Sequence, residues 1–515
     1  MLLPPARFSN PALQTPPPGR GSTAPPFPKL PRMKPLTIAV LLAALSLAAC
    51  AARPAGDPAE LAADRDRSAA AREGAVARLA ERLEDPTAAP AARDQLKSIA
   101  WSRREPFTLR RAAINALLES DPADTRTMLA LLLPTEPSAD VVEFIAETAA
   151  ERDWTDLAAP LIRAWTRPRP GTAFTDRAEP RAIADLHPGR DLAEIVFDVF
   201  ITPAPDRAFN DKERRAAWEA LGLLDPTGAT AAERLAELPP TEDPLVAAVQ
   251  SAAVELGAVP PTQEQLEWLT LLRSPAFSAA YANARRVIAR LSPDQREGLA
   301  LRHAPALAAA EISNPELLSL DREDLLDLLR ERLAARRTSL RSAEGGARDP
   351  LAESLPRAEP ELAWADLVHI LAIDDAVRAP RLVAQLFDHA DRDHADTSTE
   401  YGGVLVDPDD DPRTTYRTIL YPPRPAQRQG DKRFIAAPEM FSQHPDALAH
   451  FHFHVQSTRN ARYAGPGPAD LAYADAFGRA NLVLTFIDED TLAVDYYQPG
   501  GATLDLGHIT RPAAD

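Results

Sequence analysis

The sequence predicts a multidomain protein in which an all-α N-terminal domain precedes an α/β C-terminal domain with a mixed sheet. Between residues 59 and 340, apolar residues recur at helical spacing, and no stretch of useful length alternates like a strand. Beyond residue 360 the composition changes, because eight of the ten histidines and seven of the eight tyrosines lie there. The Gly- and Pro-containing stretch 341–360 is the predicted linker, and 361–515 is the predicted α/β domain.

The N-terminal part of the chain is predicted to lie outside the folded domains. Residues 1–32 are polar and rich in proline, so they are expected to be disordered, and Met33 is the expected natural start. Lys34 precedes an apolar run that ends in Leu-Ala-Ala-Cys at Cys50, and this pattern over 33–49 resembles the signal peptide of bacterial lipoproteins. The alternative is an ordinary secretory signal in which Cys50 has no role.

The lipoprotein resemblance implies a location for the protein. Cys50 would become the acylated first residue, and residues 50–58 would form a short tether to the folded part. Cys50 is the only cysteine, so no disulfide can form within the chain. We therefore expect a protein of the bacterial cell envelope that is lipid-anchored to a membrane and faces the periplasm or another extracytoplasmic space.

The charge of the chain argues against nucleic acid as a partner. Acidic residues outnumber basic ones by 75 to 57, which gives a net charge of −18 at pH 7. The sequence has no stretch rich in lysine and arginine with interleaved aromatic residues, which is the pattern that phosphate backbones attract. The expected partners are a membrane, through the lipid anchor, and a protein or peptide ligand.

The region 59–340 is predicted to be a series of short helices. From Leu109 to Leu117, apolar residues stand at i, i+3, i+4, i+7 and i+8, and Asp-Pro pairs such as Asp121-Pro122 mark helix starts. Such helices pack either as an α-solenoid with a weak resemblance to HEAT repeats or as an irregular bundle, since no strict period is found. The region is either a concave binding surface or a spacer. The tryptophans are predicted to lie in hydrophobic cores, and they are Trp101, Trp154, Trp165, Trp218, Trp268 and Trp364.

A histidine-rich strand is the most distinctive segment of the C-terminal domain. In an extended strand, His450, His452 and His454 share one face while the intervening apolar residues share the other. Two imidazoles two residues apart on one strand can converge on a single cation. Asp470 follows a Gly/Pro-rich turn and precedes an apolar helix predicted at 471–480, where it is a helix cap, a third metal ligand, or both.

These residues resemble the JAB/MPN (JAMM) metalloprotease superfamily. The family pattern is a glutamate before a Gly-containing strand, then His-x-His-Pro, then Ser-x-x-Asp. Here Glu400 precedes Tyr-Gly-Gly-Val-Leu, His452 and His454 flank one phenylalanine, and Asp470 ends the stretch Gly-Pro-Ala-Asp. The strands predicted at 481–487, 491–497 and 503–509 fit the same fold. The resemblance covers the C-terminal domain and says nothing of the rest.

The resemblance implies a zinc site and a reaction. His452, His454 and Asp470 would be the zinc ligands, and Glu400 would be the general base in the hydrolysis of a peptide or isopeptide bond. Zinc suits imidazole and carboxylate ligands, and it lowers the pKa of a bound water toward about 7.

Three departures from the family pattern leave two functions open. Val455 replaces the proline, the interval from His454 to Asp470 is longer, and Gly467 replaces the serine that helps to hold the oxyanion. One hypothesis is a zinc-dependent peptidase or isopeptidase, which the presence of Glu400 with all three ligands favours. The other is a non-catalytic JAMM-like module, with or without metal, that binds an envelope protein or peptide on a helical scaffold. The glycine in the serine position favours this second hypothesis.

Overall fold

The structure is a computed structural model, and it describes residues 56–169, 171–203, 207–225, 228–336, 353–406 and 416–513. Contacts divide these residues into two compact units, one with 56–164 and 169–186, and the other with 165–168 and the residues from 187 onward. No helix among the described residues has the length and apolar character needed to cross a bilayer. The predicted signal peptide, Cys50 and most of the tether lie outside the described residues.

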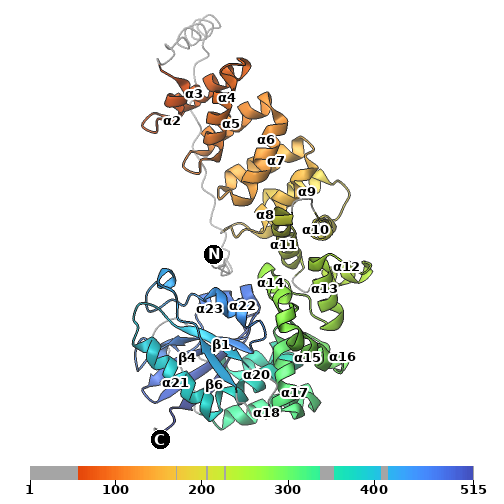
Figure 1. Cartoon of the computed structure of the whole chain (residues 1–515), viewed down its shortest axis with the longest axis vertical. Helices are drawn as coiled ribbons and strands as arrows, with labels where there is room; N and C mark the ends of the chain where they lie inside the picture. The colour runs from red at the N-terminus through yellow and green to blue at the C-terminus, as the bar shows by residue number, and fades with distance from the viewer. Residues whose placement is uncertain are drawn as a thin grey trace, which may run out of the picture. The chain divides into compact units, whose positions relative to one another are not determined.

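The first unit is built from helices that contact the next helix along the chain or the one after it (Figure 1). The helices are α2 (Pro58–Ala63), α3 (Ala69–Glu81), α4 (Ala89–Trp101), α5 (Phe107–Ser120), α6 (Pro122–Leu132), α7 (Ala139–Glu151), α8 (Ala158–Trp165) and α9 (Ala178–Leu186). Their starts follow the predicted chemistry, since the Asp121 side chain accepts the Asp124 N–H and Pro122 occupies the first turn of α6. The all-helical prediction for this part of the chain is confirmed.

The second unit combines helices with a sheet. Its helices before the predicted linker are α10 (Leu192–Ile201), α11 (Arg207–Leu224), α12 (Ala229–Glu237), α13 (Pro244–Glu255), α14 (Gln263–Leu272), α15 (Ser278–Ile288), α16 (Pro293–Arg296), α17 (His303–Ser313) and α18 (Arg322–Ala334). Those after it are α19 (Leu355–Ala358), α20 (Trp364–Val377), α21 (Pro380–His394), α22 (Pro438–Gln443) and α23 (Pro468–Phe477). The strands are β1 (Gly402–Val406), β2 (Arg417–Leu420), β3 (Ala449–His454), β4 (Asn481–Asp488), β5 (Thr491–Tyr497) and β6 (Thr503–Thr510).

The sheet is mixed, as predicted, with the strand order β2-β1-β3-β4-β5-β6. Strands β3 and β4 pair in parallel, and the other neighbours pair antiparallel. Parallel neighbours need a crossover connection, and α23 supplies it between β3 and β4. The start of this crossover helix therefore lies close to the end of the histidine strand.

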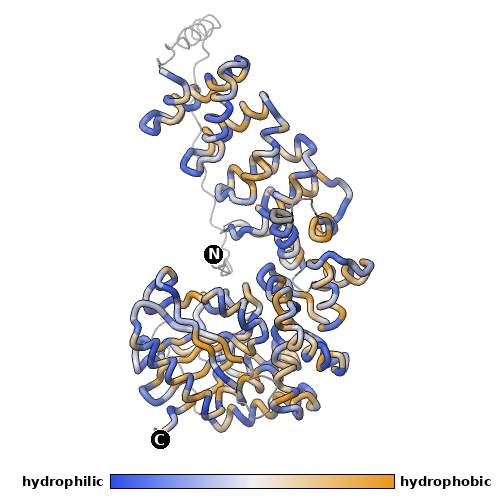
Figure 2. Tube along the Cα trace, viewed as in Figure 1, coloured by the Kyte–Doolittle hydropathy of each residue, from blue (hydrophilic) through white to orange (hydrophobic). Residues whose placement is uncertain are grey.

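One large hydrophobic core of the second unit joins the sheet to helices from both sides of the predicted linker. Phe451 of β3 and Leu484 of β4 share this core with Leu307 of α17, Leu326 of α18 and Ile370 of α20. Figure 2 shows apolar, orange stretches in the sheet, whereas the helices alternate between orange and blue. The division between the two units thus falls at 164–187 and not at 341–360, because α13, α14, α15, α17 and α18, which precede the predicted linker, share a core with the sheet.

Helix α14 forms hydrogen bonds with the segment before the histidine strand β3 and with the crossover helix α23. Trp268 Nε1 donates to the carbonyl oxygen of Pro445, which precedes β3, at 2.6 Å. Thr262 Oγ1 donates to the carbonyl oxygen of Ala476, in the last turn of α23, at 3.0 Å. The guanidinium of Arg479 lies 3.6 Å from the centroid of the Trp268 ring. A helix that was predicted to belong to the N-terminal domain therefore supports the C-terminal sheet.

A recurring buried ion pair joins neighbouring helices in both units. In each case an arginine Nε donates to a carbonyl oxygen in the preceding helix, and the same guanidinium pairs with an acid that directly precedes a proline. The sets are Arg72 with Ala62 and Glu105, Arg110 with Ala100 and Glu136, and Arg214 with Phe200 and Asp243. Removing one partner of such a buried pair typically costs about 3–5 kcal/mol. The apolar pattern of the sequence has no strict period, whereas this arginine contact recurs between successive helices.

Two details of the predicted elements differ from the structure. The helix predicted at 471–480 runs from Pro468 to Phe477, because proline fits its first turn and Gly478, at a φ of 68°, ends it. Trp101 is 40% exposed, so its prediction as a core residue is wrong, since it stands in the last turn of α4. The other five tryptophans are buried, as predicted.

Candidate metal centre

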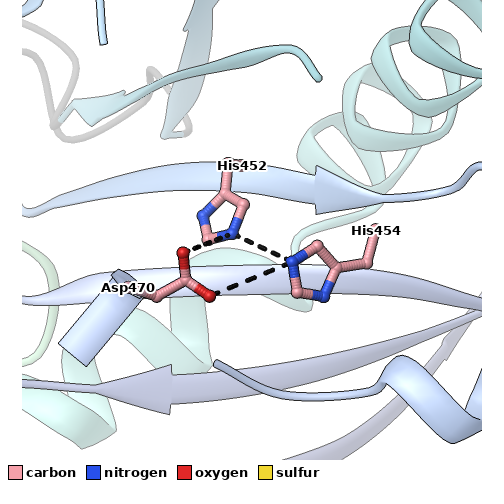
Figure 3. Close-up of side chains that lie close together, drawn as sticks. All are labelled: His452, His454 and Asp470. Atoms are coloured by element: carbon pink, nitrogen blue, oxygen red, sulfur yellow. Dashed lines mark hydrogen bonds and ion pairs between the residues drawn. The ribbon is translucent and has the colours of Figure 1, made fainter. Parts of the chain in front are cut away.

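Three side chains from two elements converge on one face of the sheet. His452 and His454 come from β3, and Asp470 comes from the first turn of α23; Figure 3 shows all three pointing toward one another. His452 Nε2 lies 3.3 Å from His454 Nε2 and 3.5 Å from Asp470 Oδ1, and His454 Nε2 lies 4.0 Å from Asp470 Oδ2. In the described part of the chain, no other group of three or more His, Cys, Asp or Glu side chains meets the spacing of a metal site.

Two of the three donor separations approach those of a tetrahedral zinc site, and the third, the 4.0 Å between His454 Nε2 and Asp470 Oδ2, is wider. With donors about 2.0–2.1 Å from the ion, neighbouring donors in a tetrahedron stand about 3.3–3.4 Å apart. The two Nε2 atoms have that separation, and Asp470 Oδ1 is close to it from His452. Two imidazole nitrogens with one carboxylate oxygen also leave a fourth position, as in catalytic zinc sites. The donor set is therefore of a chemical kind that zinc accepts, and the cluster is a candidate metal site.

Each histidine of the cluster has a further contact at its Nδ1 atom. His454 Nδ1 lies 2.8 Å from the carbonyl oxygen of Tyr463, which can only accept, so Nδ1 carries a proton, and the neutral form of the ring has its lone pair on Nε2. His452 Nδ1 lies 3.5 Å from Tyr497 Oη, and the ring stacks on Phe434 with centroids 5.4 Å apart. The Tyr463 carbonyl is a partner of the kind that fixes the tautomer of a metal-binding histidine, whereas the contacts of His452 orient its ring.

Asp470 is held by the start of its own helix. It is the third residue of α23, and Oδ2 accepts the N–H of Gly467, the residue before the helix, at 2.5 Å. Its capping role and a ligand role are therefore compatible. Burial alone would raise the pKa of Asp470, but the neighbouring His452 and His454 and the Gly467 N–H outweigh it and hold the pKa at about 2. The carboxylate is anionic at neutral pH.

Glu400 lies on the same face of the sheet as the cluster. Strand β1 pairs antiparallel with β3, and Gly402 stands opposite His452. Two residues earlier in this register, Glu400 falls opposite His454, and residues two apart along a strand face the same side. The carboxyl group of Glu400 interacts electrostatically with His452 and Asp470. The fold thus brings together the four residues that the sequence analysis selected.

The Glu400 side chain is 4% exposed and is oriented by a short chain of amides. Gln456 Nε2 donates to Glu400 Oε1 at 2.6 Å, and Asn460 Nδ2 donates to Gln456 Oε1 at 2.8 Å. The same Asn460 amide donates to the carbonyl oxygen of His454 at 2.9 Å. Burial raises the pKa of Glu400 to about 7, although the charge of His452 opposes this change. A carboxyl group with a pKa near neutrality is suited to accepting and returning a proton.

His450 shares the histidine face but lies outside the cluster. Its Nδ1 is 2.8 Å from Tyr473 Oη, and its ring packs edge-on against Phe441. Burial, together with the charge of Arg479, lowers the pKa of His450 well below its ordinary value, so the ring is neutral. His450 therefore packs beside the cluster and fills the space under α22 and α23.

The sequence analysis missed the residues that surround the cluster. Phe434 lies in the segment between β2 and α22, and Tyr463 and Gln456 lie in the segment between β3 and α23. Each reaches the cluster through loop conformation, which leaves no periodic signal in the sequence. The one available signal was length, since the interval from His454 to Asp470 exceeds that of the family pattern and makes room for Tyr463.

A second buried carboxyl group, that of Asp393, contacts the backbone next to Glu400. Asp393, at the end of α21, is 2% exposed, and its carboxyl group accepts the backbone N–H of Tyr401. Burial raises the pKa of Asp393 to about 8, and the charges of Glu400, Asp431 and Asp396 add to this shift. The folded protein therefore holds a proton on Asp393 at neutral pH, which fixes the backbone next to Glu400 without adding a charge.

The stability of the protein is expected to depend on pH through Asp393. Because its pKa is higher in the folded state than in the unfolded state, its contribution falls as pH rises from about 4 to about 8. Asp393→Asn cannot titrate, so between about pH 5.5 and pH 8 its unfolding free energy should gain about 2–4 kcal/mol relative to the parent. Denaturant unfolding at each pH measures this, with the exposed Asp391→Asn on the same helix as the control. Parallel pH profiles of parent and Asp393→Asn would contradict the prediction.

Comparison with known proteins gave no relative on which to rest an assignment. No family model, no curated protein and no solved structure matches the chain.

Proposed function

We propose that the chain is a lipid-anchored envelope protein whose C-terminal part is a zinc-dependent peptidase or isopeptidase resembling the JAMM superfamily. The observation that carries the proposal is the convergence of His452, His454 and Asp470, whose ligand atoms lie within 4.8 Å of one another, with Glu400 on the same face. The anchor rests on the sequence pattern that ends at Cys50, which lies outside the described residues.

The roles of the residues follow from their contacts. A bound zinc ion would supply a water of lowered pKa and would polarise the substrate carbonyl. Gln456 holds Oε1 of Glu400, so Oε2 is the atom that would take the proton from water and return it to the leaving amine. Asp470 and the two histidines would keep the cation fixed, and Tyr463 would keep His454 in the required tautomer.

Metal content is the measurement that tests this proposal first. We expect the protein purified without chelator and supplied with zinc to hold nearly one zinc per chain by elemental analysis, and His452→Ala and Asp470→Ala each to lose it. His444→Ala removes a histidine that lies outside the cluster and should keep the metal. A parent protein that holds no metal after zinc is supplied would exclude a zinc enzyme.

A non-catalytic binding module is the second candidate function. It is supported by Gly467, which stands where the family pattern has an oxyanion-holding serine. Losing one oxyanion donor typically lowers the rate by about 100- to 1000-fold. Measuring zinc content and peptide hydrolysis in the parent and in Gly467→Ser distinguishes the two candidates. The serine Cβ would stand 3.2 Å from Asp470 Oδ2. Bound zinc without hydrolysis in both the parent and Gly467→Ser would favour the binding module.

We propose further that the helices before the sheet form HEAT-like repeats that present a binding surface. This is supported by the consecutive helix pairs and by the repeated arginine contacts to a preceding carbonyl and an acid-Pro pair, present in each unit. Repeats of this kind are stabilised by contacts between neighbours. A partner would be a protein or peptide of the envelope.

A further inference from the structure

Two loops border the metal-binding cluster, and each contacts one of its histidines. Residues 421–437 lead from β2 to α22, and Phe434 of this loop stacks on His452. Residues 455–467 lead from β3 to α23, and the Tyr463 carbonyl accepts from His454. A substrate that reaches the cluster would therefore meet these loops.

These loops are basic in a chain that is strongly acidic. Residues 421–437 hold four basic side chains and one acidic one, and residues 455–467 hold two basic side chains and no acidic one, so together they sum to +5. The whole chain carries −18. Glu439 and Asp396, which lie outside the loops, pair with two of these arginines, so a net charge of +3 remains when both acids are counted, and a net positive charge attracts anions.

Four of these basic side chains are available to a ligand. Arg424 pairs with Glu439, and Arg428 pairs with Asp396, so these two arginines are engaged within the fold. We call the remaining residues the basic rim, and they are Lys432, Arg433, Arg459 and Arg462. All four are exposed, and within the described residues none of them forms an ion pair with a carboxylate.

The basic rim also contains apolar surface of the kind that contacts a peptide. The Tyr463 ring is 44% exposed, and the Arg462 guanidinium lies 4.5 Å from its centroid. Phe434 and Ile435 are partly exposed beside Arg433. Arginine and tyrosine together are enriched where proteins bind peptides and proteins.

We propose that the basic rim binds an acidic peptide segment and directs it to the cluster of His452, His454 and Asp470. The inference rests on the proposed function, because it names the class of substrate for the same site. Each loop contacts one histidine of the cluster, so a ligand that contacts both loops lies beside the cluster. An extended peptide with carboxylate side chains has the length and the charge to do so.

Peptide binding tests this inference without requiring activity. Fluorescein-labelled (Glu-Gly)4, (Ser-Gly)4 and (Lys-Gly)4 are titrated with the purified full-length protein at low salt, and anisotropy is measured. We expect (Glu-Gly)4 to bind at least about tenfold more tightly than (Ser-Gly)4, and about 0.5 M salt to remove the difference. The paired change Lys432→Glu with Arg433→Glu should weaken (Glu-Gly)4 binding by about tenfold or more.

Matched variants separate the rim from general charge effects and from the zinc site. Arg381→Glu with Arg392→Glu makes the same change at two exposed positions of α21 and should leave binding unchanged. Asp470→Ala should lose zinc while keeping the preference for (Glu-Gly)4. If the parent protein holds zinc but binds all three peptides with equal affinity, the rim inference is overturned while the proposed zinc site stands. Loss of the preference in the α21 control, or rim-dependent binding of phosphatidylglycerol vesicles without a peptide preference, would also overturn it.

Discussion

Glu400→Gln is expected to keep its zinc and to lose about 10²- to 10⁴-fold in the rate of peptide hydrolysis, because it removes the general base and no metal ligand. The glutamine retains an oxygen that can accept the hydrogen bond from Gln456, now 2.6 Å from Glu400 Oε1. Burial disfavours the charged form of Glu400 and raises its pKa to about 7, so a neutral side chain is tolerated there. Glu400→Gln is therefore expected to hydrolyse peptides more slowly while the fraction of folded protein stays the same.

The measurement uses a quenched-fluorescent peptide library, with elemental zinc analysis and thermal unfolding on the same samples. Glu489→Gln is the matched control, since it makes the same substitution at an exposed turn between β4 and β5. It should hydrolyse peptides at the parent rate. A Glu400→Gln protein with zinc and full activity would show that another group takes the proton, and the proposed roles of Glu400 and Gln456 would be abandoned.

The candidate site was predictable from the sequence because its residues lie on regular elements. Alternation places His452 and His454 on one strand face, and a carboxylate at a helix start needs only Pro468 and Gly467 to set its position. The pairing of β1 with β3 then brings Glu400 to the same face. Periods of two residues and helix-start chemistry are local properties, so one sequence is sufficient to identify them.

The surroundings of the site and the division into units were not predictable in this way. Phe434 reaches His452 from a loop, and Trp268 reaches Pro445 from a helix far away in the sequence. The change in composition at 341–360 predicts a domain boundary there, yet helices before it share a core with the sheet. Such contacts depend on which apolar faces pack together in the folded protein, and the pattern of a single sequence does not show which faces these are. The raised pKa of Asp393 likewise arises from burial among other acids.

The second large effect is expected at Gly403, where β1 passes closely between its two neighbouring strands. An added Cβ would stand 2.1 Å from the carbonyl oxygen of Ile419 and 2.7 Å from Cζ of Phe451. The first of these is backbone of β2, which cannot turn aside as a flexible side chain can. Overpacking of this kind typically costs about 1–3 kcal/mol, and Gly403→Ala should reach the upper end because the strands themselves must separate.

Hydrogen exchange followed peptide by peptide gives the measurement for Gly403→Ala, since it reports the sheet separately from the first unit. Exchange of β1, β2 and β3 should accelerate, while α2 to α9 should be unaffected. Gly74→Ala is the matched control, because an added Cβ there has nothing within 4 Å. In the exposed middle of α3, alanine should stabilise the helix by about 0.5–1 kcal/mol. If Gly403→Ala left exchange in the sheet unchanged, β2 would have to shift freely against β1. The strand that leads to Glu400 would then be too mobile to hold a general base beside the histidines.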